Sequence, residues 1–237
     1  MTKSLHKTFD ILEYVVLQCG RSVTPGEVAS YAKLNAATCT RIMGELLERG
    51  YLNKVSRKAG YVPGPMVVSL GTRDNCYRRL AAAANEPVRA LAERIRMSVN
   101  LAVMHRGERI MLSFYSAREN WIPWKRFTFG DDHASTATGW LLLAAMDEDE
   151  AMRIIQEKHL PITRRDLELV SRRGFVDFVS PEDSIRVMGH LIRAEGYPPA
   201  AIGFGIRQGD DPAEILKLSE KTAQRIRSNL TREERSY

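Results

Sequence analysis

The side chains best suited to chemistry lie in one short segment, NAATCTRIMGELLERGYL, at positions 35–52. Its apolar residues recur at helical spacing and form a single stripe, made of Cys39, Ile42, Met43, Leu46 and Leu47. The opposite side of this expected helix keeps small and polar side chains near its start, namely Ala37, Thr38, Thr40 and Arg41. Hydroxyl groups and a guanidinium can donate hydrogen bonds to phosphates and base edges, so this face is suited to nucleic acid.

Three helices are expected to position that face. The first covers residues 4–19, with an apolar stripe of Leu5, Phe9, Leu12, Val16 and Cys19 that Ile11 and Val15 widen. The second starts at TPGE, where Thr24 and Glu27 fit a capping box around Pro25. Asn35 is the expected cap of the third helix, which ends at Gly50. Two short helices joined by such a turn form a helix-turn-helix unit.

Two strand-like runs follow the third helix. YLNKV and YVPG flank the basic turn SRKAG, which predicts a hairpin and completes a winged helix-turn-helix. The major groove of B-DNA admits one helix, whose first residues lie nearest the bases. We therefore expect double-stranded DNA as the partner. The predicted contacts are Lys7, Thr24, Asn35, Ala37, Thr38, Thr40, Arg41 and, at the wing tip, Arg57 and Lys58.

The net charge of +6 is unevenly distributed along the 237 residues. Residues 1–73 carry ten Lys or Arg against five Asp or Glu, whereas residues 74–237 carry 25 against 24. The length is enough for one large or two small domains of roughly 100–200 residues each. A basic N-terminal domain joined to a nearly neutral larger one indicates a polyanionic partner for the first.

Several motifs of this segment resemble the DNA-binding half of the IclR family of transcriptional regulators. They are Ser4–Leu5–His6–Lys7, Leu34 with Thr38 and Arg41, Gly50–Tyr51–Leu52, and Tyr61 with Gly64. The resemblance implies DNA contacts by Thr38 and Arg41, a pseudo-palindromic operator, and a homodimer that can assemble further as a dimer of dimers. It continues in LAERIRMSVNLAVMHRGERIMLSF, in ASTATGWLLLAAM and in the segment from Leu167 to Ile206, which are similar to the effector-binding domain of the family.

The rest of the chain is expected to be an α+β domain. Strands are predicted in SVNLAVMH, RIMLSFYS, FVDFV, IRVMGHLIRA and AAIGFGI, and helices at about 136–146, 148–158, 165–173 and 212–230. The family resemblance implies a GAF-like, mainly antiparallel sheet. We expect a winged helix-turn-helix domain at 1–66, a linker helix at 67–86 that breaks at Pro87, and an effector-binding and oligomerisation domain at 87–237.

A small-molecule site is predicted around the aromatic stretch NWIPWKRFTFGDDHASTATGW. Aromatic side chains can form an apolar wall, and a helix start can hold a carboxylate, so a small, apolar or aromatic organic acid is the expected effector. The predicted wall residues are Trp121, Trp124, Phe127, Val187, Gly189 and His190, with Ser135 and Thr136 at the helix start. The alternative is that these side chains fill a core or an interface and that the two hydroxyls only cap the helix.

Other classes of function are disfavoured by the motifs. The sequence has no Gly-x-Ser-x-Gly elbow, no Walker loop and no His-Glu-x-x-His, which argues against an enzyme, and we expect neither a metal nor a cofactor. Three widely spaced cysteines predict reduced thiols in a cytoplasmic protein, and no apolar run has the length of a bilayer span. Two alternatives are kept: a winged-helix adaptor that binds protein, and an enzyme that processes small acids.

Overall fold

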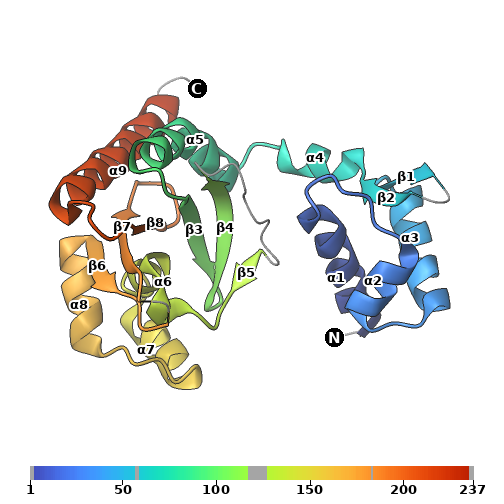
Figure 1. Cartoon of the computed structure of the whole chain (residues 1–237), viewed down its shortest axis with the longest axis horizontal. Coiled ribbons are helices and arrows are strands. Elements are labelled where there is room, and N and C mark those ends of the chain that lie inside the picture. Colours follow the sequence, from blue (N-terminus) through green and yellow to red (C-terminus); the bar gives the residue numbers. More distant parts are fainter. Residues whose placement is uncertain (1–2, 57–58, 117–126, 183, 235–237) are drawn as a thin grey trace. The chain divides into compact units, whose positions relative to one another are not determined.

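The computed structural model describes residues 3–56, 59–116, 127–182 and 184–234. They form two compact units. The first contains the described residues up to Arg73 together with Phe127, and the second contains the other described residues from Asp74 onwards. The N-terminal unit, blue to cyan in Figure 1, contains α1 (Lys3–Leu17), α2 (Pro25–Ala32), α3 (Ala36–Glu48), β1 (Leu52–Ser56), β2 (Gly60–Pro63) and α4 (Pro65–Gly71). The expected winged helix-turn-helix is confirmed.

The starts of α2 and α3 follow from their capping residues. Thr24 and Glu27 form the predicted capping box, and Pro25 occupies the first turn. The side chain of Asn35 accepts a hydrogen bond of 2.8 Å from the amide of Thr38. Between the two helices, Lys33 adopts the left-handed conformation (φ 52°) and ends α2.

The orientation of α1 differs from the expectation. Ile11 and Val15 are fully buried, whereas Leu5 and Phe9 are 50% and 54% exposed. The predicted stripe through Leu5 and Phe9 is therefore wrong, because the packing of α1 on α2 and α3 turns the side with Ile11 and Val15 to the core.

The wing is fixed to the helical part of the unit through Val23. The amide and carbonyl of Val23 exchange two hydrogen bonds of 2.8 Å with those of Tyr61 in β2. Gly60 allows this approach, since a Cβ at this position would lie 2.1 Å from the carbonyl oxygen of Val23, and its φ of +90° also favours glycine.

The C-terminal unit is built on one antiparallel sheet in the order β5-β4-β3-β8-β7-β6. Its strands are β3 (Val99–His105), β4 (Glu108–Tyr115), β5 (Thr128–Phe129), β6 (Phe175–Val179), β7 (Arg186–Ile192) and β8 (Ala200–Ile206). Its helices are α5 (Cys76–Ile95), η1 (His133–Ser135), α6 (Ala137–Leu143), α7 (Glu148–Glu157), α8 (Arg164–Arg173) and α9 (Pro212–Glu234). The predicted α+β class and strands are confirmed.

Each face of the sheet has its own hydrophobic core. On one face α5 and α9 lie side by side (Figure 1). Their apolar side chains form one core with Leu101, Met188 and Ile202 of the sheet. On the other face α6, α7 and α8 pack against Ala102, Leu191 and Ala201. This arrangement decides which side chains of a strand can share a site, because successive residues point to opposite faces.

Two glycines let α6 lie directly on the sheet. Gly189 and Gly203 are partners in the register of β7 and β8. A Cβ on Gly189 would lie 3.0 Å from Cβ of Ala137, and one on Gly203 would lie 2.8 Å from Cγ2 of Thr138. The space beside these glycines is thus filled by α6.

The segment between the wing and the sheet differs from the predicted linker helix at 67–86. It consists of α4, a break at residues 72–75, and α5, which continues through Pro87 to Ile95. The predicted break at Pro87 is wrong, because the side-chain amide of Asn229 on α9 satisfies the Ala83 carbonyl that the proline leaves without its helical donor. From Leu80 onwards, one side of α5 belongs to the core of the C-terminal unit.

Two kinds of feature are absent from the part of the chain that the structure describes, a membrane-spanning helix and a metal cluster. None of its helices combines the length and apolar character that crossing a bilayer requires. Within the same residues, no group of three or more His, Cys, Asp or Glu side chains could hold a metal ion.

Candidate functional site

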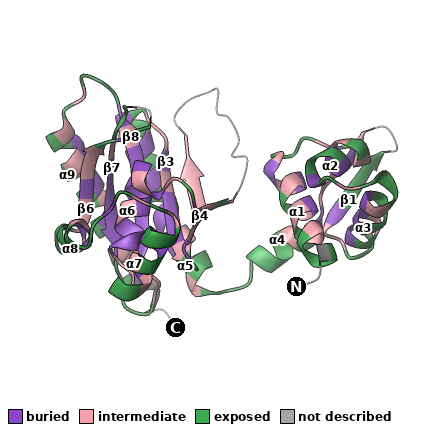
Figure 2. Cartoon of the chain, turned by 90° about the horizontal axis from the view of Figure 1, so that it is seen from below, coloured by how far each residue is buried: buried purple, intermediate pink, exposed green. Residues whose placement is uncertain are grey.

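The first half of α3 presents the predicted polar face at the surface. Cys39, Ile42, Met43 and Leu46 are buried, and on the other side Ala36, Ala37, Thr40 and Arg41 are exposed, with Thr38 half-buried. Figure 2 shows both buried and exposed residues along this helix. Small side chains around the exposed guanidinium of Arg41 make a surface that can approach a polyanion closely and donate hydrogen bonds to it.

Thr24 and Asn35 have structural roles inside the unit. The Thr24 hydroxyl donates to the Glu27 carboxylate at 2.9 Å and accepts from the Glu27 amide at 3.3 Å. The Thr24 amide, followed by the Arg21 guanidinium and the Thr24 hydroxyl, lowers the pKa of Glu27 to about 2. The polar groups of Thr24 therefore serve first to start α2, and contact of Thr24 or Asn35 with DNA stays a prediction.

The remaining predicted DNA contacts lie on α1 and the wing. Lys7 is half-exposed and its Nζ lies 3.3 Å from the carboxylate of Asp10. Arg57 and Lys58 fall outside the described residues. Lys54 on β1 is an exposed cation that the sequence analysis did not select, and its Nζ lies 5.9 Å from the centre of the Tyr61 ring. Lys54 could have been selected from the sequence, because it lies in the predicted strand that leads to the basic turn.

The predicted effector residues that the structure describes do not all lie on one side of the sheet. Val187 and Gly189 point to the face of the sheet that α6 covers. Ser135 at the end of η1 and Thr136 directly before α6 lie on the same side. His190 points to the opposite face, where its Nδ1 lies 2.8 Å from the Ser219 hydroxyl of α9. The expectation that His190 shares a site with Gly189 is therefore wrong, because adjacent strand residues point to opposite faces.

Other members of the predicted set also differ from the expectation. Gly189 packs against Ala137 and Leu141, so it provides room for α6 and not a wall for a ligand. Thr136 caps α6 without a side-chain cap bond, and its hydroxyl donates to the Asp132 carbonyl at 3.0 Å. Phe127 is half-buried, and Trp121 and Trp124 lie outside the described residues.

Beside η1 the structure contains a buried charged cluster that the sequence analysis missed. Arg109 on β4 is 1% exposed, forms an ion pair with Asp132, and donates to the Thr138 hydroxyl at 2.5 Å. Its guanidinium carbon lies 5.6 Å from the centre of the Phe129 ring. The side chains of β4 point alternately to the two faces of the sheet, and helices cover both faces. Nothing in the sequence therefore indicated that Arg109 would be buried.

His133 belongs to the same region. Its Nε2 lies 2.9 Å from the Gly107 carbonyl, and burial is the main cause that lowers the pKa of its imidazole. Nε of Arg109 and Nδ1 of His133 are buried without a hydrogen-bond partner among the described residues. Arg109 and His133 thus tie the turn that precedes α6 to β4 and to its hairpin with β3.

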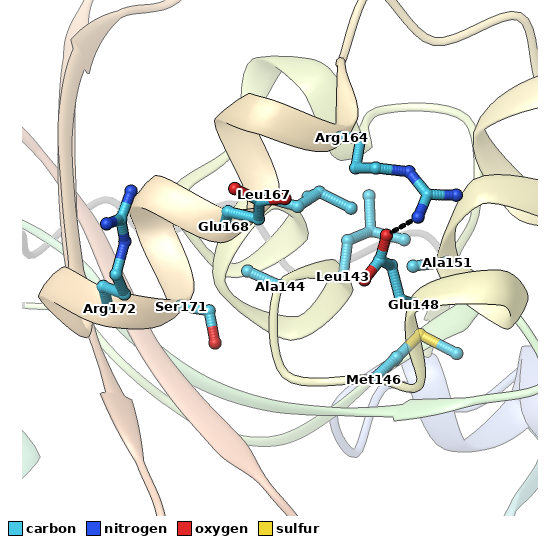
Figure 3. Close-up of a pocket in the computed structure, with 10 residues that line it drawn as sticks. All are labelled: Leu143, Ala144, Met146, Glu148, Ala151, Arg164, Leu167, Glu168, Ser171 and Arg172. Carbon is cyan, nitrogen blue, oxygen red and sulfur yellow. Dashed lines mark ion pairs between the residues drawn. The ribbon is translucent and has the colours of Figure 1, made fainter.

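A hollow of about 400 Å³ lies between α6, α7 and α8, and none of the effector candidates that the structure describes lines it. Its floor is apolar, with Leu143, Ala144 and Leu167. Figure 3 shows Arg164 directed towards Glu148, with which it forms an ion pair, and Arg172 and Ser171 at the other end. The volume is sufficient for a small ligand.

Comparison with known proteins identifies the fold. No protein-family model and no curated protein matches the chain. Among solved structures, an IclR homologue from Microbacterium hydrocarbonoxydans complexed with 4-hydroxybenzoate has a TM-score of 0.78 at 19% identity, covering 97% of this chain and 99% of that one. An IclR transcriptional regulator from Alicyclobacillus acidocaldarius has a TM-score of 0.70 at 19% identity (97% and 99% covered), and Thermotoga maritima IclR one of 0.65 at 21% (96% and 98%).

The fold and the exposed face of α3 define a two-domain protein with a winged helix-turn-helix and an α+β sheet domain. More specifically, the chain has the fold of the IclR-type transcriptional regulators over nearly its whole length. The resemblance seen in the sequence motifs is thereby confirmed for the fold.

Proposed function

We propose that this chain is a transcriptional regulator of the IclR type that binds operator DNA through α3 and the wing. The observation that carries the proposal is the exposed face of Ala37, Thr40 and Arg41, with Thr38 half-buried beside them, at the start of a helix whose other side is core. The excess of positive charge in residues 1–73 supports it, because neutralising phosphates supplies much of the affinity for DNA.

The proposed contact places the start of α3 in the major groove. Arg41 contacts a guanine or a phosphate, and Thr38 and Thr40 donate to phosphate oxygens or base edges. We further propose that two copies act together, since two-fold symmetry lets paired helices read two half-sites about one helical turn apart. The protein is proposed to act as a regulator and not as an enzyme. Its proposed location is the cytoplasm, where it can reach the DNA.

The sheet domain is proposed to bind a small organic acid that changes the affinity for DNA. The solved IclR homologue with 4-hydroxybenzoate supports this, since it has the same fold. We place the acid on the α6 side of the sheet, where Ser135, Thr136 and Val187 remain candidates. Trp121, Trp124 and Phe127 stay predictions from the sequence. The ligand can shift DNA affinity only as far as it prefers one arrangement of the protein over the other.

The domain organisation follows from the same proposal. Residues 1–66 would read DNA, and the sheet domain would bind the acid and hold the oligomer together. The covalent connection between them runs through α4 and the start of α5. A ligand-dependent change must therefore alter the placement of α4 or α5, or the oligomer that carries them.

The test of DNA binding uses the purified full chain and a pool of random duplexes, from which bound sequences are selected. Arg41→Ala should weaken binding to the selected operator by roughly 5- to 150-fold, because a specific arginine–base contact discriminates by about 1–3 kcal/mol. Arg49→Ala removes the same charge at the far end of α3 and is the matched control. Unchanged affinity of the Arg41 variant, or no salt-dependent binding by the natural chain, would reject the proposal.

The ligand is tested separately by thermal unfolding with 4-hydroxybenzoate and related aromatic and aliphatic acids. An acid that binds the folded state raises the unfolding temperature in a concentration-dependent way. The same acid should then change the affinity for the selected operator. Stabilisation with no change in DNA affinity would contradict the regulatory part of the proposal.

A further inference from the structure

The exposed side of α3 does not end with Arg41. Thr38, Arg41 and Glu45 follow one another at spacings of three and four residues, which places them on one face of the helix. Arg41 and Glu45 are both exposed. Oppositely charged side chains four residues apart often pair, yet among the described residues none of the ion pairs includes either of these two.

A carboxylate on this face conflicts with a surface that only contacts phosphates. Facing the DNA backbone, Glu45 would repel the phosphates and weaken binding to every sequence. Facing the base edges, the same carboxylate can accept a hydrogen bond from the N4 amino group of cytosine. Glu45 can therefore contribute to sequence recognition only if its carboxylate faces the base edges.

The geometry of an α-helix sets where such a contact falls. Four residues advance about 6 Å along the helix axis, and base pairs of B-DNA are stacked about 3.4 Å apart. A helix lying along the groove therefore brings Glu45 within reach of base edges about one or two pairs beyond those that Arg41 reaches. Glu48 lies at the last residue of α3, farther from the end of the helix that enters the groove.

We propose that Glu45 is a specificity-determining residue, which accepts a hydrogen bond from a cytosine one or two base pairs from the pair contacted by Arg41. The inference rests on the proposed DNA-binding function and deepens it by naming a base. Arg41 supplies attraction to DNA, and Glu45 excludes sequences that leave its carboxylate without an amino group. Pairing with cytosine discriminates by roughly fivefold or more against other bases at that position.

The test compares operators selected from a random duplex pool by the full chain and by Glu45→Gln. The natural chain should enrich a half-site with a cytosine at the predicted spacing. The Gln variant should replace that cytosine by adenine, because a carboxamide pairs with N6 and N7 of adenine. Glu45→Ala should lose the preference at this one position and keep the rest of the site.

Glu48→Gln is the matched control, since it removes the same charge from the same helix. It should select the same bases as the natural chain. If Glu45→Gln selects an unchanged operator, or if both Gln variants only raise affinity for all duplexes alike, the inference is overturned while the proposed function stands. If the natural chain selects no sequence at all, the proposed function itself fails.

Discussion

The side-chain amide of Asn229 on α9 donates a hydrogen bond of 2.9 Å to the carbonyl oxygen of Ala83 on α5. In an uninterrupted helix this carbonyl would accept from the amide of residue 87, but Pro87 has no N–H. Ala83 is buried, so its carbonyl depends on a partner within the protein. Asn229 therefore replaces a backbone hydrogen bond and joins the two helices that cover one face of the sheet.

We expect Asn229→Ala to destabilise the C-terminal unit by about 1–3 kcal/mol, because it leaves a buried carbonyl unsatisfied. In a Pro87→Ala background the new amide can bond to Ala83, so the same change should cost less. Urea unfolding of the four proteins in this double-mutant cycle measures the coupling. Equal costs of Asn229→Ala in both backgrounds would show that the bond does not compensate for the proline.

Gly139 is expected to be intolerant of even one methyl group. A Cβ there would lie 2.3 Å from the His133 carbonyl oxygen, so Gly139→Ala should destabilise by about 1–3 kcal/mol. Gly44→Ala is the matched control in α3, because nothing lies within 4 Å of its Cβ position. Alanine in a helix interior is preferred to glycine by about 0.5–1 kcal/mol, so Gly44→Ala should stabilise. Chemical denaturation should show a lower free energy of unfolding for Gly139→Ala and a higher one for Gly44→Ala. An unchanged free energy of unfolding in Gly139→Ala would contradict the packing of α6 against η1.

His190 makes stability depend on pH. Burial disfavours its imidazolium and, with the positive charge of Arg227, lowers its pKa to about 4 from 6.5. The unfolded chain thus takes up the proton more readily than the folded one. The contribution of His190 to the free energy of unfolding is therefore fully present above pH 6.5 and is lost as the pH decreases from 6.5 towards 4. The loss reaches about 3 kcal/mol across that range.

The variant His190→Gln should therefore show a shallower loss of unfolding free energy between pH 7 and pH 4.5. Exposed His105→Gln should keep the natural profile. Burial lowers the pKa of His133 as well, so some pH dependence should remain in the His190 variant. Superimposable profiles of the natural chain and His190→Gln would refute the assignment.

The cysteines should differ widely in reactivity. Cys39 is fully buried, and burial raises the pKa of its thiol, whereas Cys19 is exposed. With an aromatic disulfide reagent near pH 8, Cys19 should react at once and Cys39 only when the N-terminal unit opens. Peptide mapping by mass spectrometry assigns the sites and separates Cys19 from the half-exposed Cys76, and Cys19→Ser should remove the Cys19 adduct from the fast phase. Rapid modification of native Cys39 would mean that its side of α3 is not core.

Local rules were sufficient to predict the winged helix-turn-helix unit. The capping box at Thr24 and Glu27, the Asn35 cap and the 3.6-residue stripe of α3 are short-range features, and each has its predicted place in the structure. The same is true of β3, β4, β6, β7 and β8, whose apolar composition is local, whereas the short edge strand β5 was not predicted. For α1 the predicted stripe was wide, and only packing decided that Ile11 and Val15 are buried while Leu5 and Phe9 are exposed.

The contacts around the predicted effector residues could not be predicted in the same way. Alternation along β7 shows that Gly189 and His190 point apart, but not that α6 covers one and α9 the other. Arg109 and Asp132 are 23 residues apart, and their ion pair exists only because β4 and η1 meet. A site made from several elements depends on their packing, which no single segment encodes.

The sequence by itself determined the class of each domain, the limits of most elements and the polar face of α3, because caps, turns and periodicity act over a few residues. The tertiary structure decided the partners of side chains that meet across elements. It carries α5 through Pro87 by means of Asn229, sets His190 against α9, and buries Arg109 beside Asp132. The reason is that a proline, a histidine or an arginine acquires its role from the groups that surround it, and those groups come from distant parts of the chain.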